Sequence, residues 1–236
     1  MARVNAATLS TRQRAALSEM EIDVWVTRHS DSTESAVLNA DSSVTGSWEQ
    51  LNNTIRACTR CELHQSRTKA VCGVGSMSAD WLIIGEAPGA DEDQQGEPFV
   101  GRAGQLLNEM LYAAGLMREQ VFITNILKCR PPENRDPKPA EVEQCMPYLQ
   151  QQIATIKPRL ILLVGGIAAH NLLQVDTPVG KLRGQVHHYG EANIPVVVTY
   201  HPAYLLRSPG QKRKSWGDLM LAMDVAQDLV KDIGNG

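Results

Sequence analysis

Four short apolar runs, separated by helical patterns, constrain the fold of this chain more than any other feature. The runs are rich in branched side chains, as strands buried on both faces are, and they cover residues 81–85, 121–127, 160–164 and 196–200. Helical patterns lie between or after them, at residues 103–115, 139–156, 166–173 and 215–233. Because strands and helices alternate along the chain, the sequence predicts an α/β fold with a parallel sheet and helices on both of its faces.

The net negative charge of the chain comes from its N-terminal part. The 236 residues carry a net charge of -3, and residues 1–50 hold four Lys and Arg against seven Asp and Glu, which accounts for all of it. A run rich in Ser, Asp and Thr at residues 29–46 is typical of a linker, and a capping box of Ser47 and Gln50 predicts a helix after it. We therefore expect an N-terminal extension over residues 1–46 and one main domain over residues 47–236.

The hydropathy pattern gives no sign of a membrane segment. No apolar stretch approaches the roughly 20 residues needed to cross a bilayer, and the N-terminus lacks a basic region followed by an apolar block. We therefore expect a cytoplasmic protein without a membrane partner. A net negative charge is unusual for a protein that binds nucleic acid, but beyond residue 50 the positive and negative charges balance at 19 each.

Four of the five cysteines could supply one metal centre. Cys58 and Cys61 form a C-x-x-C pair, and Cys129 and Cys145, with fifteen residues between them, lie in a distant segment. Soft thiolate ligands suit both a tetrahedral zinc ion and an iron–sulfur cluster. The wide spacing of the second pair favours a cluster, and four unrelated buried cysteines are the remaining alternative. Cys72 fits better as a small buried residue than as a fifth ligand.

Several residues directly after the predicted strands are candidates for a ligand site, because ligands of parallel sheets bind at the carboxyl ends of the strands. The first strand leads into the glycine-rich segment of residues 85–104, whose backbone could approach a ligand closely. Asn125 ends the second strand, and its amide can both donate and accept a hydrogen bond, as recognition of a base edge requires. His201 follows the fourth strand. Taken singly, a turn Asn and a surface or packing His are the more common roles.

Taken together, these segments resemble one known family, the iron–sulfur uracil-DNA glycosylases usually called family four. The resemblance is carried by the C-x-x-C pair and by the segments GEAPGADED, GEPFVGRAGQLL, ITNILKCRPPENR and HPAYLLR, and it covers nearly all of residues 47–232. It implies a three-layer α/β/α fold around a four-stranded parallel sheet. It also implies a [4Fe-4S] cluster on Cys58, Cys61, Cys129 and Cys145, and so favours iron–sulfur over zinc.

The resemblance further implies an enzyme of base excision repair that flips uracil out of DNA and hydrolyses its N-glycosidic bond. Phe99 would stack on the flipped base, Asn125 would hydrogen-bond its Watson–Crick edge, and Glu92 would help to exclude the methyl group of thymine. His201 would donate a hydrogen bond to the uracil oxygen on which negative charge develops. The segment that begins at Glu86 would help to position the attacking water.

Two leucines and a set of cations are expected to contact the DNA. Leu205 and Leu206 stand where the family inserts an apolar wedge into the base stack, which makes flipping less costly. The cations just after them, and others elsewhere in the domain, are expected to bind phosphates. The first group consists of Arg207, Lys212, Arg213 and Lys214, and the second of Arg102, Lys128, Arg130, Arg135, Lys181 and Arg183.

The N-terminal extension supports a second hypothesis, from a different class. Residues 14–28, RAALSEMEIDVWVTR, resemble the start of the psi subunit of the bacterial DNA polymerase III clamp loader, and an apolar segment on a polar linker has the form of a partner-binding peptide. Residues 1–46 would then contact clamp-loader subunits in DNA replication. The alternative protein is an inactive scaffold with the glycosylase fold that acts as a psi-like accessory subunit. Because all four pocket residues of the family are present, we favour the enzyme.

Overall fold

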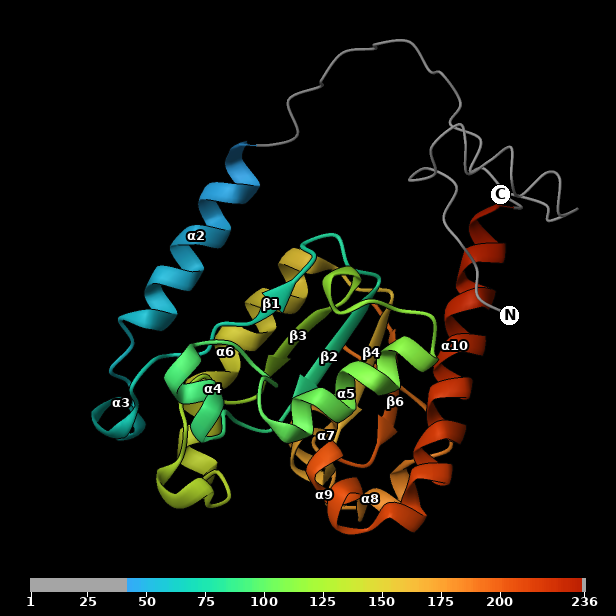
Figure 1. Cartoon of the computed structure of the whole chain (residues 1–236). Helices are drawn as coiled ribbons and strands as arrows, with labels where there is room; N and C mark the ends of the chain where they lie inside the picture. The colour runs from blue at the N-terminus through green and yellow to red at the C-terminus, as the bar shows by residue number, and fades with distance from the viewer. Residues whose placement is uncertain (1–41, 235–236) are drawn as a thin grey trace, which may run out of the picture. The chain divides into compact units, whose positions relative to one another are not determined.

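The computed structural model describes residues 42–234 of the chain (Figure 1). The chain divides into two units, residues 1–41 and Ser42–Gly236, and only the second contains described residues. The segment compared with the psi subunit, residues 14–28, lies outside the described residues, as does most of the extension predicted over residues 1–46. The helix predicted to begin at Ser47 begins earlier, as α2, Ser42–Arg56.

The central sheet of the described residues has six strands in the order β1-β3-β2-β4-β6-β5 (Figure 1). Its four middle strands are parallel and correspond to the four apolar runs: β2, Trp81–Gly85; β3, Phe122–Asn125; β4, Leu160–Val164; and β6, Ile194–Thr199. Two short antiparallel strands extend the edges: β1, Val74–Gly75, and β5, Val186–Tyr189. The expected parallel strands are therefore present, while the expected count of four is too low. Edge strands lack the continuous apolar run by which strands buried on both faces are recognised.

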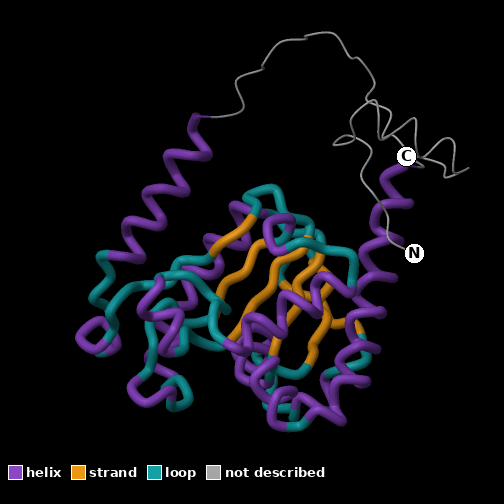
Figure 2. The backbone as a smooth tube through the Cα atoms, in the orientation of Figure 1, coloured by secondary structure: helices purple, strands orange, loops and turns teal. Residues whose placement is uncertain are grey.

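Helices cover both faces of the sheet, as Figure 2 shows by colour. Helix α6 begins at Pro139, and the fixed φ of proline suits the first turn of a helix. Glu141 caps this end by accepting a hydrogen bond from the backbone N–H of Lys138 at 2.8 Å. The other helices are α3, Leu63–Ser66; α4, Ala90–Gln95; α5, Arg102–Ala113; α7, Gly166–Leu173; α8, Val179–Leu182; α9, Pro202–Arg207; and α10, Lys212–Gly234, while α6 itself is Pro139–Ile156.

The hydrophobic core lies in two layers, one on each face of the sheet. Successive strand residues point to opposite faces, so Leu82 and Ile84 pack in one layer while Trp81 and Ile83 pack in the other. The first layer is closed by α2, α6 and α7, and the second by α5 and α10. The α/β/α arrangement predicted from the sequence is thus confirmed.

The parallel strands end at one edge of the sheet, and the segments that follow them gather there. The chain leads from β2 into α4, from β3 into the segment before α6, from β4 into α7 and from β6 into α9. In sheets of this kind that edge is where ligands bind. None of the described helices is long and apolar enough to cross a membrane.

Candidate active site at the carboxyl edge of the sheet

The carboxyl ends of the parallel strands border a cavity of about 430 Å³. Small-molecule sites typically occupy roughly 300–1,000 Å³. The lining comes from the segments after β2 and β3 and from the first turns of α5 and α9. Five of the residues predicted for the site line this one cavity: Glu86, Glu92, Phe99, Asn125 and His201.

Asn125 ends β3 and offers an unsatisfied acceptor to the cavity. The residue is 2% exposed, and its backbone is paired with Gly85 of β2. Among the described residues, no group donates a hydrogen bond to the buried Oδ1 atom of Asn125. A buried acceptor without a partner costs free energy, so this carboxamide is prepared for a ligand that brings a donor into the cavity.

Phe99 provides an aromatic wall beside Asn125. Its ring lies against Gly85 and 5.7 Å from the imidazole of His201, between ring centroids. Its backbone has a φ of 53°, in the left-handed region that costs a residue with a side chain about 1–3 kcal/mol. Arg118 holds this turn by donating hydrogen bonds to the carbonyl groups of Pro98 at 2.5 Å and of Phe99 at 3.3 Å.

The carboxylate of Glu92 ties the cavity wall together. One oxygen accepts hydrogen bonds from the backbone N–H groups of Val100 at 2.9 Å and Gly101 at 3.0 Å, and the other accepts from Gly89 at 3.1 Å. These bonds join the first turn of α4 to the turn that carries Phe99. Glu92 therefore lines the cavity, but its carboxylate oxygens are bonded to backbone N–H groups. In this structure its role is to hold the cavity wall formed by residues 89–101 in place.

His201 precedes α9 and is held as a neutral imidazole. Its Nδ1 atom accepts a hydrogen bond from the backbone N–H of Ala203 at 3.1 Å, so the ring proton is on Nε2. Burial lowers the pKa of His201 to about 4, and the positive charge of Arg207 acts in the same direction. At neutral pH the residue is thus a hydrogen-bond donor without a positive charge.

Glu86 is a carboxyl group of the cavity whose pKa is strongly raised. Burial raises the pKa of Glu86 to about 7, and the nearby negative charge of Asp136 raises it further. Both residues line the same cavity. A carboxylate with a pKa near neutrality is suited to accept a proton in general base catalysis.

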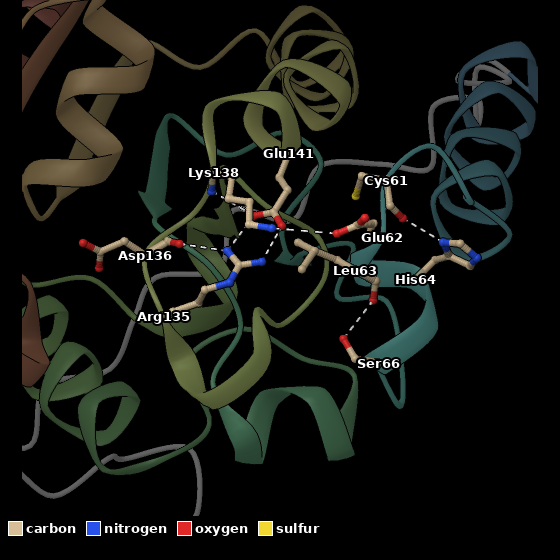
Figure 3. A network of polar contacts seen from close by, with 9 residues as sticks. All are labelled: Cys61, Glu62, Leu63, His64, Ser66, Arg135, Asp136, Lys138 and Glu141. Carbon is tan, nitrogen blue, oxygen red and sulfur yellow. Dashed lines mark hydrogen bonds and ion pairs between the residues drawn. The ribbon is translucent and has the colours of Figure 1, made fainter.

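The segment between β3 and α6 closes one side of the cavity and is fastened to α6 (Figure 3). Arg135 forms a two-bond ion pair with Glu141, at 2.9 and 2.5 Å, and also donates to the backbone carbonyl of Asp136 at 2.9 Å. Arg135 holds the pKa of Glu141 below its ordinary value. An exposed pair of Lys138 and Glu62 at 3.8 Å adds little.

Two other cations predicted to bind phosphate also have partners within the domain. Lys128 is 1% exposed, and Arg183 forms an ion pair with the fully buried Asp218 at 2.8 Å. Asp218 also accepts a hydrogen bond from Thr199 at the end of β6. Lys128 is too deeply buried to reach a phosphate in this structure, whereas a contact of the partly exposed Arg183 with DNA stays a prediction.

The predicted wedge and cation cluster lie at the end of α9 and the start of α10. Leu205 is 1% exposed and belongs to the core, whereas Leu206 is 37% exposed. The four cations after them, Arg207, Lys212, Arg213 and Lys214, are all exposed, and Arg207 also lines the cavity. Of the two leucines, only Leu206 is exposed.

The four cysteines predicted as ligands line a second, small cavity between α2, α3, α6 and the end of β3. Cys58, Cys61, Cys129 and Cys145 all border it. Two of the sulfur atoms accept hydrogen bonds: Cys129 from Arg67 at 3.0 Å and Cys145 from the backbone N–H of Lys128 at 3.3 Å. Among the described residues, no three His, Cys, Asp or Glu side chains are grouped closely enough to hold a metal ion.

Burial also sets the ionisation of these thiols, raising the pKa of Cys145 to about 11 and that of Cys129 above its ordinary value. Cys72 does not line this cavity; it is buried against the backbone of Asn52.

The sequence marks the glycine-rich segment of residues 85–104 but not the reason why single glycines in it are needed. Gly85 is needed because a Cβ atom there would stand 2.4 Å from Asn125 Oδ1 and 2.6 Å from Phe99 Cζ. Gly104 is needed because a Cβ atom there would lie 1.8 Å from the carbonyl oxygen of Phe99. Nothing in the sequence distinguishes Arg118 as the residue that holds Phe99.

The ring face of Phe99 and the unsatisfied Oδ1 atom of Asn125 lie side by side, which suits the binding of a flat polar ring. The pocket is part of a three-layer α/β domain. The sequence signature of the uracil DNA glycosylase superfamily matches residues 72–220, which include both side chains and His201. The chain therefore belongs to the uracil DNA glycosylase superfamily.

Relatives within this superfamily are similar to most of the chain. A type-4 uracil-DNA glycosylase from Archaeoglobus fulgidus is 46% identical over 170 residues, which cover 69% of this chain and 85% of the relative. One from Pyrobaculum aerophilum is 45% identical over 190 residues, covering 78% and 97%. One from Thermotoga maritima is 41% identical over 163 residues, covering 68% and 83%. The resemblance to glycosylases of this type is thus confirmed.

The space around Gly85 provides a structural test of the pocket. We expect Gly85→Ala to displace the side chains of Asn125 and Phe99, because the added methyl group would overlap both. The crystal structure of the variant, compared with that of the parent protein, measures the displacement. Gly217→Ala is the matched control, because a Cβ atom there meets no atom within 4 Å. Unmoved Asn125 and Phe99 side chains in Gly85→Ala would contradict the described packing.

Proposed function

We propose that this chain is a uracil-DNA glycosylase, an N-glycosidic bond hydrolase of base excision repair. The observation that carries the proposal is the buried, unsatisfied Oδ1 atom of Asn125, which faces a cavity that Phe99 and the neutral His201 also line. The names of the relatives, type-4 uracil-DNA glycosylases, support it. Substrate, partner and reaction follow from this assignment: uracil-containing DNA, hydrolysed at the bond between base and sugar.

Recognition of uracil would rest on Asn125 and Phe99. A base inside a duplex cannot reach this cavity, so the nucleotide must be flipped out of the stack. Asn125 Oδ1 accepts a hydrogen bond from N3–H of uracil, and the amide group of the same side chain donates to O4. Phe99 stacks on the ring. Glu92 keeps the wall in place through its bonds to the backbone N–H groups of Val100 and Gly101, and so limits the room for a methyl group at C5.

Catalysis would rest on His201 and Glu86. As the glycosidic bond breaks, its electron pair moves onto the base, and Nε2–H of His201 donates a hydrogen bond to the developing charge on uracil O2. A neutral donor stabilises this anion without first transferring its proton, as the low pKa of His201 requires. Glu86, when ionised, accepts a proton from the water that attacks the sugar carbon.

The DNA strand would be held by the exposed groups of α9 and α10. Leu206 acts as the wedge that fills the stack when the uracil leaves it. Arg207, Lys212 and Arg213 bind phosphates beside the cavity. Leu205, which the sequence paired with Leu206 in this role, supports the wedge from the core instead.

We also propose that the four cysteines hold a [4Fe-4S] cluster. Cys58, Cys61, Cys129 and Cys145 come from two distant segments and border one cavity, and two of the sulfur atoms already accept N–H hydrogen bonds, as cluster ligands do. The wide spacing of Cys129 and Cys145 favours a cluster over a single zinc ion. When bound, the cluster would join the end of β3 and α6 to the segment after α2.

The clamp-loader hypothesis gains no support from the comparisons. The relatives named above are glycosylases, and the superfamily signature begins at residue 72, well after residues 1–46. The contact of residues 1–46 with a clamp loader, and with it a part in DNA replication, stays a prediction. A cytoplasmic location is likewise proposed because the substrate is DNA.

Uracil release provides the direct test of activity. A uracil-containing oligonucleotide, incubated with the purified protein and then treated with alkali, should be cleaved at the uracil. His201→Ala should lower the single-turnover rate by roughly 100- to 1,000-fold, as removal of a hydrogen bond to a developing anion does. Asn125→Ala should lower it as well, because it removes the hydrogen bonds that hold the base in the pocket. His188→Ala, at an exposed histidine of β5, is the control and should keep the full rate. Folded parent protein that releases no uracil would refute the proposed activity.

The pH dependence of the single-turnover rate distinguishes Glu86 from His201. Because burial and Asp136 raise the pKa of Glu86 to about 7, its carboxylate form is lost as the pH falls through that value. The rate should therefore decline below pH 7, and this decline should be absent from Glu86→Gln, whose rate is low throughout. The pKa of His201, about 4, lies too low to cause it. A rate that stays level down to pH 5 would exclude Glu86 as the base.

Metal analysis tests the cluster. The anaerobically purified protein should contain iron and acid-labile sulfide at about four of each per chain. Cys145→Ser should lose both and melt at a lower temperature. Cys72→Ser is the matched control and should keep the iron, because Cys72 does not line the cysteine cavity. Zinc in place of iron would overturn the assignment.

A further inference from the structure

Lys128 places a buried ammonium group directly behind the base pocket. The residue follows β3 and is 1% exposed. Its Nζ atom donates hydrogen bonds to Thr124 Oγ1, to the backbone carbonyl of Asn125 and to Gln152 Oε1, each at 2.7 Å. An ammonium group has three protons, so every one of them has an acceptor. A lysine is rarely buried to this extent without such partners.

The same network reaches two other elements. Gln152 lies in α6 and is fully buried, and its Nε2 atom donates to the backbone carbonyl of Cys72 at 2.6 Å. Thr124 donates to the same carbonyl at 3.2 Å. The end of β3 is therefore connected through Lys128 to α6 and to the segment before β1.

The backbone of Lys128 belongs to the cysteine site. Its N–H group donates to Cys145 Sγ at 3.3 Å, and its carbonyl accepts from Val71 at 2.8 Å. The next residue, Cys129, lines the cysteine cavity. One residue thus contacts a sulfur atom through its backbone and Asn125 through its side chain.

We propose that Lys128 is a positioning residue that holds Asn125 in the orientation needed to bind the base. The proposal rests on the assigned uracil-DNA glycosylase activity. The carbonyl group of Asn125 has a charge-assisted hydrogen bond to the ammonium group, which fixes the peptide unit from which the Asn125 side chain extends. The side chain can then keep its Oδ1 atom buried and unsatisfied until a base enters. Without the ammonium group, the Asn125 peptide unit keeps only the bond from Ile126 N–H to the Gly85 carbonyl, so the Asn125 carboxamide is held less firmly in the plane of the base.

A double-mutant cycle tests whether Lys128 acts through Asn125. Lys128→Met keeps the length of the side chain and removes the charge and the donors, and it should lower the single-turnover rate of uracil release by roughly 10- to 100-fold, as misplacement of a binding group does. The KM for uracil-containing DNA should change little, because exposed cations bind the strand. In the Asn125→Ala background, the same substitution should cost less than about threefold.

Thr124→Val is the matched control. It removes one acceptor of the ammonium group but leaves the bond to the Asn125 carbonyl, so it should lower the melting temperature while the rate stays within about threefold of the parent. If Lys128→Met does not fold, Lys128→Gln replaces it in the cycle.

The outcomes separate this inference from the activity on which it rests. The positioning role would be overturned if the rate loss of the double variant equalled the product of the losses in Lys128→Met and Asn125→Ala. It would also be overturned by an unchanged rate in Lys128→Met. A parent protein that releases no uracil would instead refute the activity itself.

Discussion

The site depends on the pairing of Gly85 with Asn125 at the carboxyl ends of β2 and β3. This parallel register brings a residue without a side chain next to one with a carboxamide, and the space left by the missing Cβ atom is shared by Asn125 Oδ1 and the ring of Phe99. The pairing continues beyond the strands, where Ile126 donates to the carbonyl of Gly85 at 2.9 Å and Leu127 to that of Glu86 at 3.0 Å. The position of the proposed base is therefore decided by the backbone of the sheet, with the side chains fitted around it.

Burial at this edge of the sheet shifts the pKa values of His201 and Glu86 in opposite directions, and both shifts suit the proposed reaction. The desolvated environment disfavours charge on both, so the pKa of His201 falls to about 4 and that of Glu86 rises to about 7. A histidine that stays neutral can donate a hydrogen bond to a leaving anion, and a carboxyl group near neutrality can take a proton from water. Asp136 and Arg207 strengthen these shifts, so charged residues at the rim adjust the chemistry of the groups inside.

The sequence predicts the fold because the fold depends on local patterns, whereas Glu86, Glu92 and Phe99 are assigned only through the family resemblance. Four apolar runs mark four buried strands, and residues that follow such strands meet at one edge, which brings Asn125 and His201 together. What the sequence does not reveal is the environment of each cation. Lys128 and Arg183 are indistinguishable by pattern from the exposed Lys212, yet the first two are held by acceptors from elements distant in the chain. Leu205 lies in the core and Leu206 at the surface because successive residues of α9 point in different directions around the helix.

The proposed cluster site and the base pocket share one stretch of chain, so a cluster bound at the cysteines would be connected to the pocket through the backbone. Cys129 lies in the segment that leads from β3 into α6, Cys145 lies within α6, and the ion pair of Arg135 and Glu141 connects this segment to the first turn of α6. Arg135 and Asp136 line the base cavity from this segment. If this segment moved, Asp136, whose negative charge adds to the effect of burial on the pKa of Glu86, would move with it. A structural centre at the cysteines would therefore act on the chemistry through the position of Asp136, with no need for the cluster itself to reach the substrate.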